Sequence, residues 1–170
     1  MRRCFNNAAV ITIVSIALVL VGCAGLGPTQ QPDWREHISA VLPPEDGPLQ
    51  FSSAAEWYPD AQGFTKERNL VLGVSDSRQG TFALTLTSLI FMSWDKPSSR
   101  YSIMYRTAYA DIQSSRVDTF GRARRIVIAG KDYRMQSFAL VGPKGAMVDQ
   151  EATNAAADMI TALIPKTRLE

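Results

Sequence analysis

The strongest restriction on the fold of this chain is a series of short strand-forming segments between residues 69 and 140. Each segment is rich in Val, Ile, Thr, Tyr and Phe, and clusters of Gly, Asp, Ser and Pro separate one from the next. Such segments, with no helical pattern between them, predict an antiparallel sheet built from consecutive hairpins. We expect seven strands, over Asn69–Asp76, Gly80–Thr85, Ser88–Trp94, Arg100–Thr107, Ile112–Thr119, Ala123–Ala129 and Tyr133–Leu140.

The fourth segment shows the period of two that is typical of a half-buried strand. Tyr101, Ile103 and Tyr105 are separated by single residues. We therefore expect their three side chains to share one face of the sheet.

The end of the chain predicts one amphipathic helix. Small and apolar residues recur at steps of three and four between Ala152 and Leu163, with polar residues between them. Asp149 is the expected N-cap, and Pro165 should end the helix. An Ala-rich face of this kind can lie close against a sheet.

Two shorter helical segments are expected before the strands. Asp33 can cap a helix that ends at Pro43-Pro44, and Ser52–Tyr58 is expected to form another helical turn before Pro59.

Seven strands followed by a helix is the arrangement of the pleckstrin-homology superfold, and the sequence resembles the GRAM and bacterial pleckstrin-homology-like domains. The run Gly80–Phe91 looks like their first hairpin, and Asp111-Ile112 resembles their step into the next strand. The resemblance covers about residues 69–164. It implies a mainly β (α+β) fold, in which a seven-stranded antiparallel barrel or sandwich is capped by the C-terminal helix. Another small antiparallel barrel or sandwich is the alternative.

The N-terminus has the three parts of a signal peptide. Arg2 and Arg3 precede an uncharged run from Ala8 to Val21, and small residues follow. As a helix the run would reach roughly 21 Å, whereas the hydrocarbon core of a bilayer is about 30 Å thick. A cleaved leader is therefore favoured over a membrane-spanning helix.

The segment Leu20-Val21-Gly22-Cys23 resembles the lipobox of bacterial lipoproteins. The resemblance implies that the bond between Gly22 and Cys23 is cut, and that Cys23 becomes a diacylglyceryl cysteine with further acylation of the palmitate type. Two or more acyl chains anchor a protein stably. Ala24 follows, which implies the periplasmic face of the outer membrane if the envelope is Gram-negative. The alternative is an ordinary secretory leader in which Cys23 has no part.

Loss of the leader changes the charge and the thiol content. The formal charge of the whole chain is +2, and Arg2 and Arg3 leave with the leader, so the mature chain is formally neutral. A nucleic-acid partner is therefore not expected. Cys4 also leaves, and a lipidated Cys23 offers no free thiol.

These observations divide the chain into four parts. They are a signal peptide over residues 1–22, a flexible tether rich in Gly, Pro and Gln over 23–33, an N-terminal helical segment over 34–62, and a pleckstrin-homology/GRAM-like β domain with its helix over 63–165.

The sequence contains no pattern typical of a catalytic or metal site. His37 is the single histidine, and the carboxylates are scattered over different segments. We expect no catalytic residues, no metal and no cofactor.

Two groups of residues are candidates for contacts. Trp57 and Tyr58 could bind a protein partner, although packing in the core is the alternative for them. The basic residues nearest one another could face an anionic surface, or could simply be a solvated hairpin edge. They are Arg116, Arg122, Arg124, Arg125, Lys131 and Arg134.

The preferred function is therefore that of a non-catalytic, lipid-tethered interaction module, which recruits an envelope protein or peptide through a strand edge or the segment around Trp57. The alternative is a binder of a small apolar or anionic ligand, held between the sheet and the terminal helix. An enzyme is the third and weakest hypothesis.

Overall fold

The structure is a computed structural model, and it describes residues 26–29, 31–59, 77–120, 123–142 and 147–165. The lipobox, Arg122 and the predicted strand Asn69–Asp76 lie outside the described residues.

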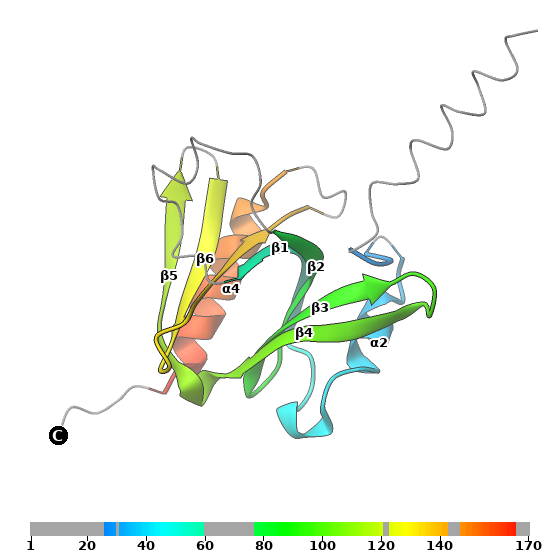
Figure 1. Cartoon of the computed structure of the whole chain (residues 1–170), viewed down its shortest axis with the longest axis horizontal. Coiled ribbons are helices and arrows are strands. Elements are labelled where there is room, and N and C mark those ends of the chain that lie inside the picture. The colour runs from blue at the N-terminus through cyan, green and yellow to red at the C-terminus, as the bar shows by residue number, and fades with distance from the viewer. Residues whose placement is uncertain (1–25, 30, 60–76, 121–122, 143–146, 166–170) are drawn as a thin grey trace, which may run out of the picture.

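In the part of the chain that the structure describes, seven strands form one antiparallel sheet in the order β4-β3-β2-β1-β7-β6-β5. The predicted class is confirmed: the fold is mainly β, a seven-stranded antiparallel sheet against which the C-terminal helix packs (Figure 1). The strands are β1 (Phe51–Pro59), β2 (Arg78–Leu84), β3 (Ser88–Asp95), β4 (Arg100–Ala108), β5 (Ile112–Phe120), β6 (Ala123–Gly130) and β7 (Met135–Leu140).

The first strand is the main correction. Ser52–Tyr58 is not a helical turn but most of β1, which pairs with β2 on one side and with β7 on the other. The sheet therefore begins within the segment that we assigned to residues 34–62. Pairing along both edges and burial of Ala55 and Trp57 outweigh the helix propensity of Ala54, Ala55 and Glu56.

The concave face of the sheet holds the main core. Its centre is a group of phenylalanine rings, Phe82, Phe91 and Phe138, all fully buried. Helix α4 (Gln150–Leu163) closes this core, because Ala156 and Ile160 are fully buried against it. The Asp149 side chain accepts a hydrogen bond from the Ala152 N–H at 2.9 Å, as expected of the cap.

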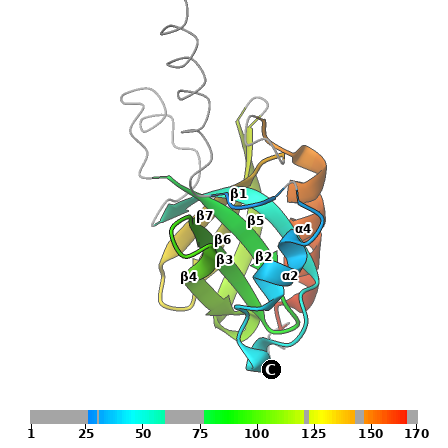
Figure 2. The same cartoon turned by 90° about the vertical axis from the view of Figure 1, so that its right-hand side faces the viewer.

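A second core lies on the opposite face of β2 and β3. Helix α2 (Trp34–Ser39) contributes Ile38, which packs with Ala83, Ile90 and Met92. Figure 2 shows α2 in front of β2, with the loop that follows it reaching the short helix η1 (Pro44–Asp46). The middle of the sheet is thus buried on both faces.

A β-bulge overturns the predicted alternation in β4. Tyr105 pairs with Phe91 while Ile103 pairs with Met92, so Met104 is an extra residue in the ladder. As a result Tyr101 packs in the second core and Tyr105 against the main core, instead of sharing one face.

The start of the described chain corrects the predicted tether. Leu26 is buried at 3% exposure and packs with Ala54 and Val141. The segment 26–29 therefore belongs to the folded domain.

Candidate functional site

Strand β4 is an edge strand of the sheet. Among the described residues β4 pairs only with β3, so its other edge has no strand beside it. Two apolar side chains beside the bulge lie at the surface: Ile103 is 37% exposed and Met104 41% exposed. An open edge flanked by apolar side chains is the geometry at which an extended segment can add as a further strand.

An aromatic cluster lies beneath the middle of this strand. Trp57 of β1 is 7% exposed, and its ring lies 5.3 Å from that of Phe91 and 5.6 Å from that of Tyr105. Its indole N–H donates to Gln136 Oε1 at 2.8 Å. Trp57 is therefore a core residue with a satisfied polar atom, and it is not available as a surface anchor.

Tyr105 links this cluster to the surface. Its ring is partly buried, 6.0 Å from Phe138. Burial, and to a smaller degree the nearby Asp132 carboxylate, raise the pKa of Tyr105. The tyrosine is therefore a neutral hydrogen-bonding group at neutral pH.

The hairpin between β6 and β7 stands beside the end of β4. The Lys131 N–H donates to the Asp111 carbonyl at 2.9 Å, which fixes this hairpin to η2 (Tyr109–Asp111). Tyr133 at its tip is 85% exposed and has a left-handed φ of 63°. The hairpin between β6 and β7 thus lies next to the open edge of β4.

Tyr58 lies on the other face of β1 from Trp57. The Arg125 guanidinium stacks over its ring at 3.7 Å, and its hydroxyl donates to Glu56. Burial, followed by this hydrogen bond, raises the pKa of Tyr58 to about 12. The predicted pair Trp57 and Tyr58 is thus divided between the two faces of one strand.

The basic residues do not form one patch. Arg124 donates to Asn154 Oδ1 of α4 at 2.8 Å, whereas Arg125 lies on the opposite face. Lys131 and Arg134 belong to the hairpin at the other end of β6, where Arg134 lies 3.7 Å from Asp132. Of these described residues, Arg124 and Arg125 lie on opposite faces of β6, and Lys131 and Arg134 lie in the turn that follows its other end.

A buried carboxylate ties the N-terminal segment to the sheet. The Asp46 side chain is 1% exposed and accepts from Arg106 Nε at 2.8 Å, from Arg106 Nη2 at 2.7 Å and from the Ser88 hydroxyl at 2.8 Å. Hydrogen bonds from Arg106 hold the pKa of the Asp46 carboxyl below its usual value, against the effect of burial. These hydrogen bonds hold the end of β4 that carries Arg106 in place. Sequence reasoning missed it, because Asp46 in Pro-Pro-Glu-Asp-Gly looks like an ordinary turn residue.

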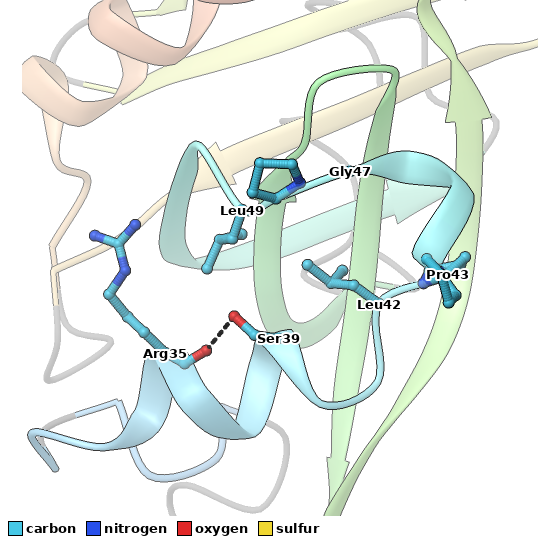
Figure 3. A pocket seen from close by; sticks show the side chains of 8 residues that line it. Arg35, Ser39, Leu42, Pro43, Gly47 and Leu49 are labelled. Carbon is cyan, nitrogen blue, oxygen red and sulfur yellow. Dashed lines mark hydrogen bonds between the residues drawn. The ribbon is translucent and has the colours of Figure 1, made fainter.

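The space between the sheet and α4 is filled by apolar side chains, among them Ile126, Ile128 and Ile160. A hollow of about 640 Å³ lies elsewhere, between α2 and the segment after it. Figure 3 shows Arg35 on one side of it and Leu42 and Leu49 on the other. The small-ligand alternative stays a prediction.

The described ranges contain no group of three or more metal-ligating side chains, and no helix among them is both long and apolar enough to cross a membrane. His37 lies 3.4 Å from Asp33, with its ring edge-on to Trp94.

No family model matches this chain, and no curated protein matches it either. Among solved structures it is similar to the Dm DCP1 EVH1 domain, solved in solution in complex with the XRN1 DBM peptide. The likeness covers 96% of each chain, with 8% sequence identity and a TM-score of 0.37. At that level it carries no information on what this chain binds.

Proposed function

We propose that this protein is a lipid-anchored, non-catalytic interaction module of a bacterial cell envelope, which binds an extended segment of a partner protein along β4. The observation that carries the binding part is the open edge of β4 with Ile103 and Met104 at its surface. The anchor and the extracytoplasmic location rest on the resemblance of Leu20–Cys23 to a lipobox.

The physical case for β4 is that an unpaired edge offers a row of backbone N–H and C=O groups. Strand addition satisfies these groups, while side-chain contacts supply specificity. Ile103 and Met104 supply apolar contacts. The hairpin between β6 and β7, which carries Tyr133, would limit which residues fit beside them. The bulge at Met104 interrupts the row, so a partner strand would pair on one side of it.

The other edge strand, β5, is a poorer candidate. Helix α4 packs over it, and the hydroxyls of Ser115 and Thr161 are hydrogen-bonded at 3.2 Å. This contact leaves less of the surface of β5 open to the side chains of an added segment.

Photocrosslinking in native membranes tests the proposed edge. A photoreactive amino acid at Ser102, exposed on β4, should trap one discrete protein adduct, whereas the same group at Ser114, exposed on β5, should trap none. Met104→Lys should abolish the Ser102 adduct, because a charge on the rim opposes the apolar contact. Val117→Lys is the matched control, since Val117 is an exposed apolar residue of β5, and it should leave the adduct unchanged.

Equal adducts from Ser102 and Ser114, or an adduct that survives Met104→Lys, would contradict binding at β4. Far-ultraviolet circular dichroism of each variant confirms that a lost adduct is not a lost fold.

A further inference from the structure

We propose that the folded domain sits directly on the lipid headgroups of the membrane that holds its anchor, with the turn between β3 and β4 and the exposed side chain of Met147 facing the bilayer. This inference rests on the proposed lipidation of Cys23. It deepens the proposed function by orienting the module.

Leu26 is fixed to the folded domain by its backbone and by its side chain. The Leu26 carbonyl accepts hydrogen bonds from the Tyr101 hydroxyl at 3.2 Å and from the Thr81 hydroxyl at 3.4 Å. Its side chain is buried between Ala54 and Val141. These contacts join the start of the domain to three strands and to the residue that follows β7.

Gly27 shows how closely this segment approaches the sheet. Its φ is 71°, and a Cβ placed on it would lie 2.3 Å from the Tyr101 hydroxyl oxygen and 3.1 Å from Trp94 Cβ. A side chain does not fit there without displacing the segment. The sequence thus supplies glycine at the point where the chain passes the aromatic pair Trp94 and Tyr101.

The chain between Leu26 and the proposed anchor at Cys23 is short. Three residues of extended chain span about 10 Å at most, so Leu26 lies within that backbone distance of Cys23. The predicted tether, had it been free as far as Asp33, would have reached about 35 Å. The headgroup layer on one side of a bilayer is itself about 5–7 Å thick. A domain fixed at Leu26 therefore stays within a few Å of the outer surface of the headgroups.

The surface near Gly27 is the one that meets the lipid headgroups. The turn after β3 lies close to Gly27, because Trp94 and Tyr101, which Gly27 approaches, pair one position before the last pair, Asp95 with Arg100. Lys96 in the turn is exposed, as are Arg100 and Asp95 of that last pair. Figure 1 shows the first described residues, in blue, beside this end of β3 and β4. On the neighbouring side Val141 forms a bridge with Val148, and the adjacent Met147 is 72% exposed. Cationic and apolar side chains are those that suit the membrane interface.

The orientation has a consequence for β4. Its first residue, Arg100, lies at the end near the bilayer, and Ala108 lies at the far end. The open edge would then rise from the membrane surface and remain accessible to a partner along its length.

Fluorescence quenching by headgroup-labelled lipid tests this seating. The acylated full chain is reconstituted in vesicles of phosphatidylethanolamine and phosphatidylglycerol that contain a nitroxide-headgroup lipid. A fluorophore is attached through Lys96→Cys, Met147→Cys or, as the control, Leu86→Cys. Leu86 is exposed at the opposite end of β3, about 25 Å from the turn at the rise of a strand. The labels at 96 and 147 should lose most of their emission, and the label at 86 should keep nearly all of it.

A second chain separates contact from mere proximity. A Gly-Ser spacer of about twelve residues inserted after Ala24 adds roughly 19 Å of mean reach without altering Leu26 or Gly27. Quenching at 96 and 147 should then fall towards that at 86. Acylated, vesicle-bound protein that is quenched equally at all three positions would overturn the seating and leave the anchor intact. Protein without acyl mass that stays in solution would overturn the anchor, and the seating with it.

Discussion

Trp57→Ala is expected to lower the free energy of unfolding by about 3–5 kcal/mol, the range found when a large aromatic side chain is removed from a core. Trp57 is 7% exposed and lies at the centre of a group of rings that includes Phe91 and Tyr105. Alanine leaves a cavity beneath β4 and also leaves the Gln136 side chain without its donor. Urea unfolding followed by fluorescence of the remaining tryptophans measures the change.

Trp57→Phe separates these two contributions. It keeps most of the ring volume but removes the N–H group, so the buried Gln136 oxygen loses its partner, at a cost of about 1–3 kcal/mol. Tyr133→Ala is the control, because Tyr133 is 85% exposed, and its effect should be within about 0.5 kcal/mol. If Trp57→Ala were as stable as the parent chain, Trp57 would be a surface residue and the described core would be wrong.

Asp46→Ala should be the second large loss, about 2–4 kcal/mol. Removing one partner of a buried ion pair costs about 3–5 kcal/mol, but the Arg106 side chain is 41% exposed and can turn to water, which reduces the loss. Glu45→Ala is the matched control, because it removes the other carboxylate near Arg106. The Glu45 side chain is 65% exposed, and exposed pairs contribute at most about 1 kcal/mol.

The contribution of Asp46 should also depend on pH. Arg106 holds the pKa of Asp46 below its usual value, so the carboxylate binds protons more weakly in the folded state than in the unfolded chain. Its stabilising contribution is therefore complete above an unfolded pKa of about 3.9, and is lost as the pH falls through the folded pKa. The difference in unfolding free energy between the parent and Asp46→Asn should shrink below about pH 4. A difference that stays constant down to pH 2 would contradict this assignment.

Much of the sheet was predictable, because strands β2 to β7 combine β-branched and aromatic residues with clear turn signals between them. β1 was missed for a local reason. The residues in the middle of β1, Ala54-Ala55-Glu56, favour a helix. Only the spacing of Phe51, Ala55 and Trp57 indicates a strand. Two-sided pairing in the middle of the sheet is a tertiary effect that local propensity does not contain.

The site was less predictable, because it depends on contacts between distant segments. The bulge at Met104 divides Tyr101 and Tyr105 between two faces, and nothing in the sequence of β4 indicates its position. The pairing of Asp46 with Arg106 joins a turn to a strand sixty positions away. Composition predicted a free tether, whereas Leu26 is buried against Ala54 and Val141. These two residues come together only when the sheet folds.

The lipid anchor is the claim on which the proposed function and the seating both depend, and intact-mass spectrometry of the protein extracted from membranes tests it most directly. We expect a chain that starts at Cys23 and carries diacylglyceryl and fatty-acyl mass, whereas Cys23→Ala should yield an unacylated precursor. A parent chain that keeps Met1 and the whole leader, without acyl mass and in the soluble fraction, would contradict it.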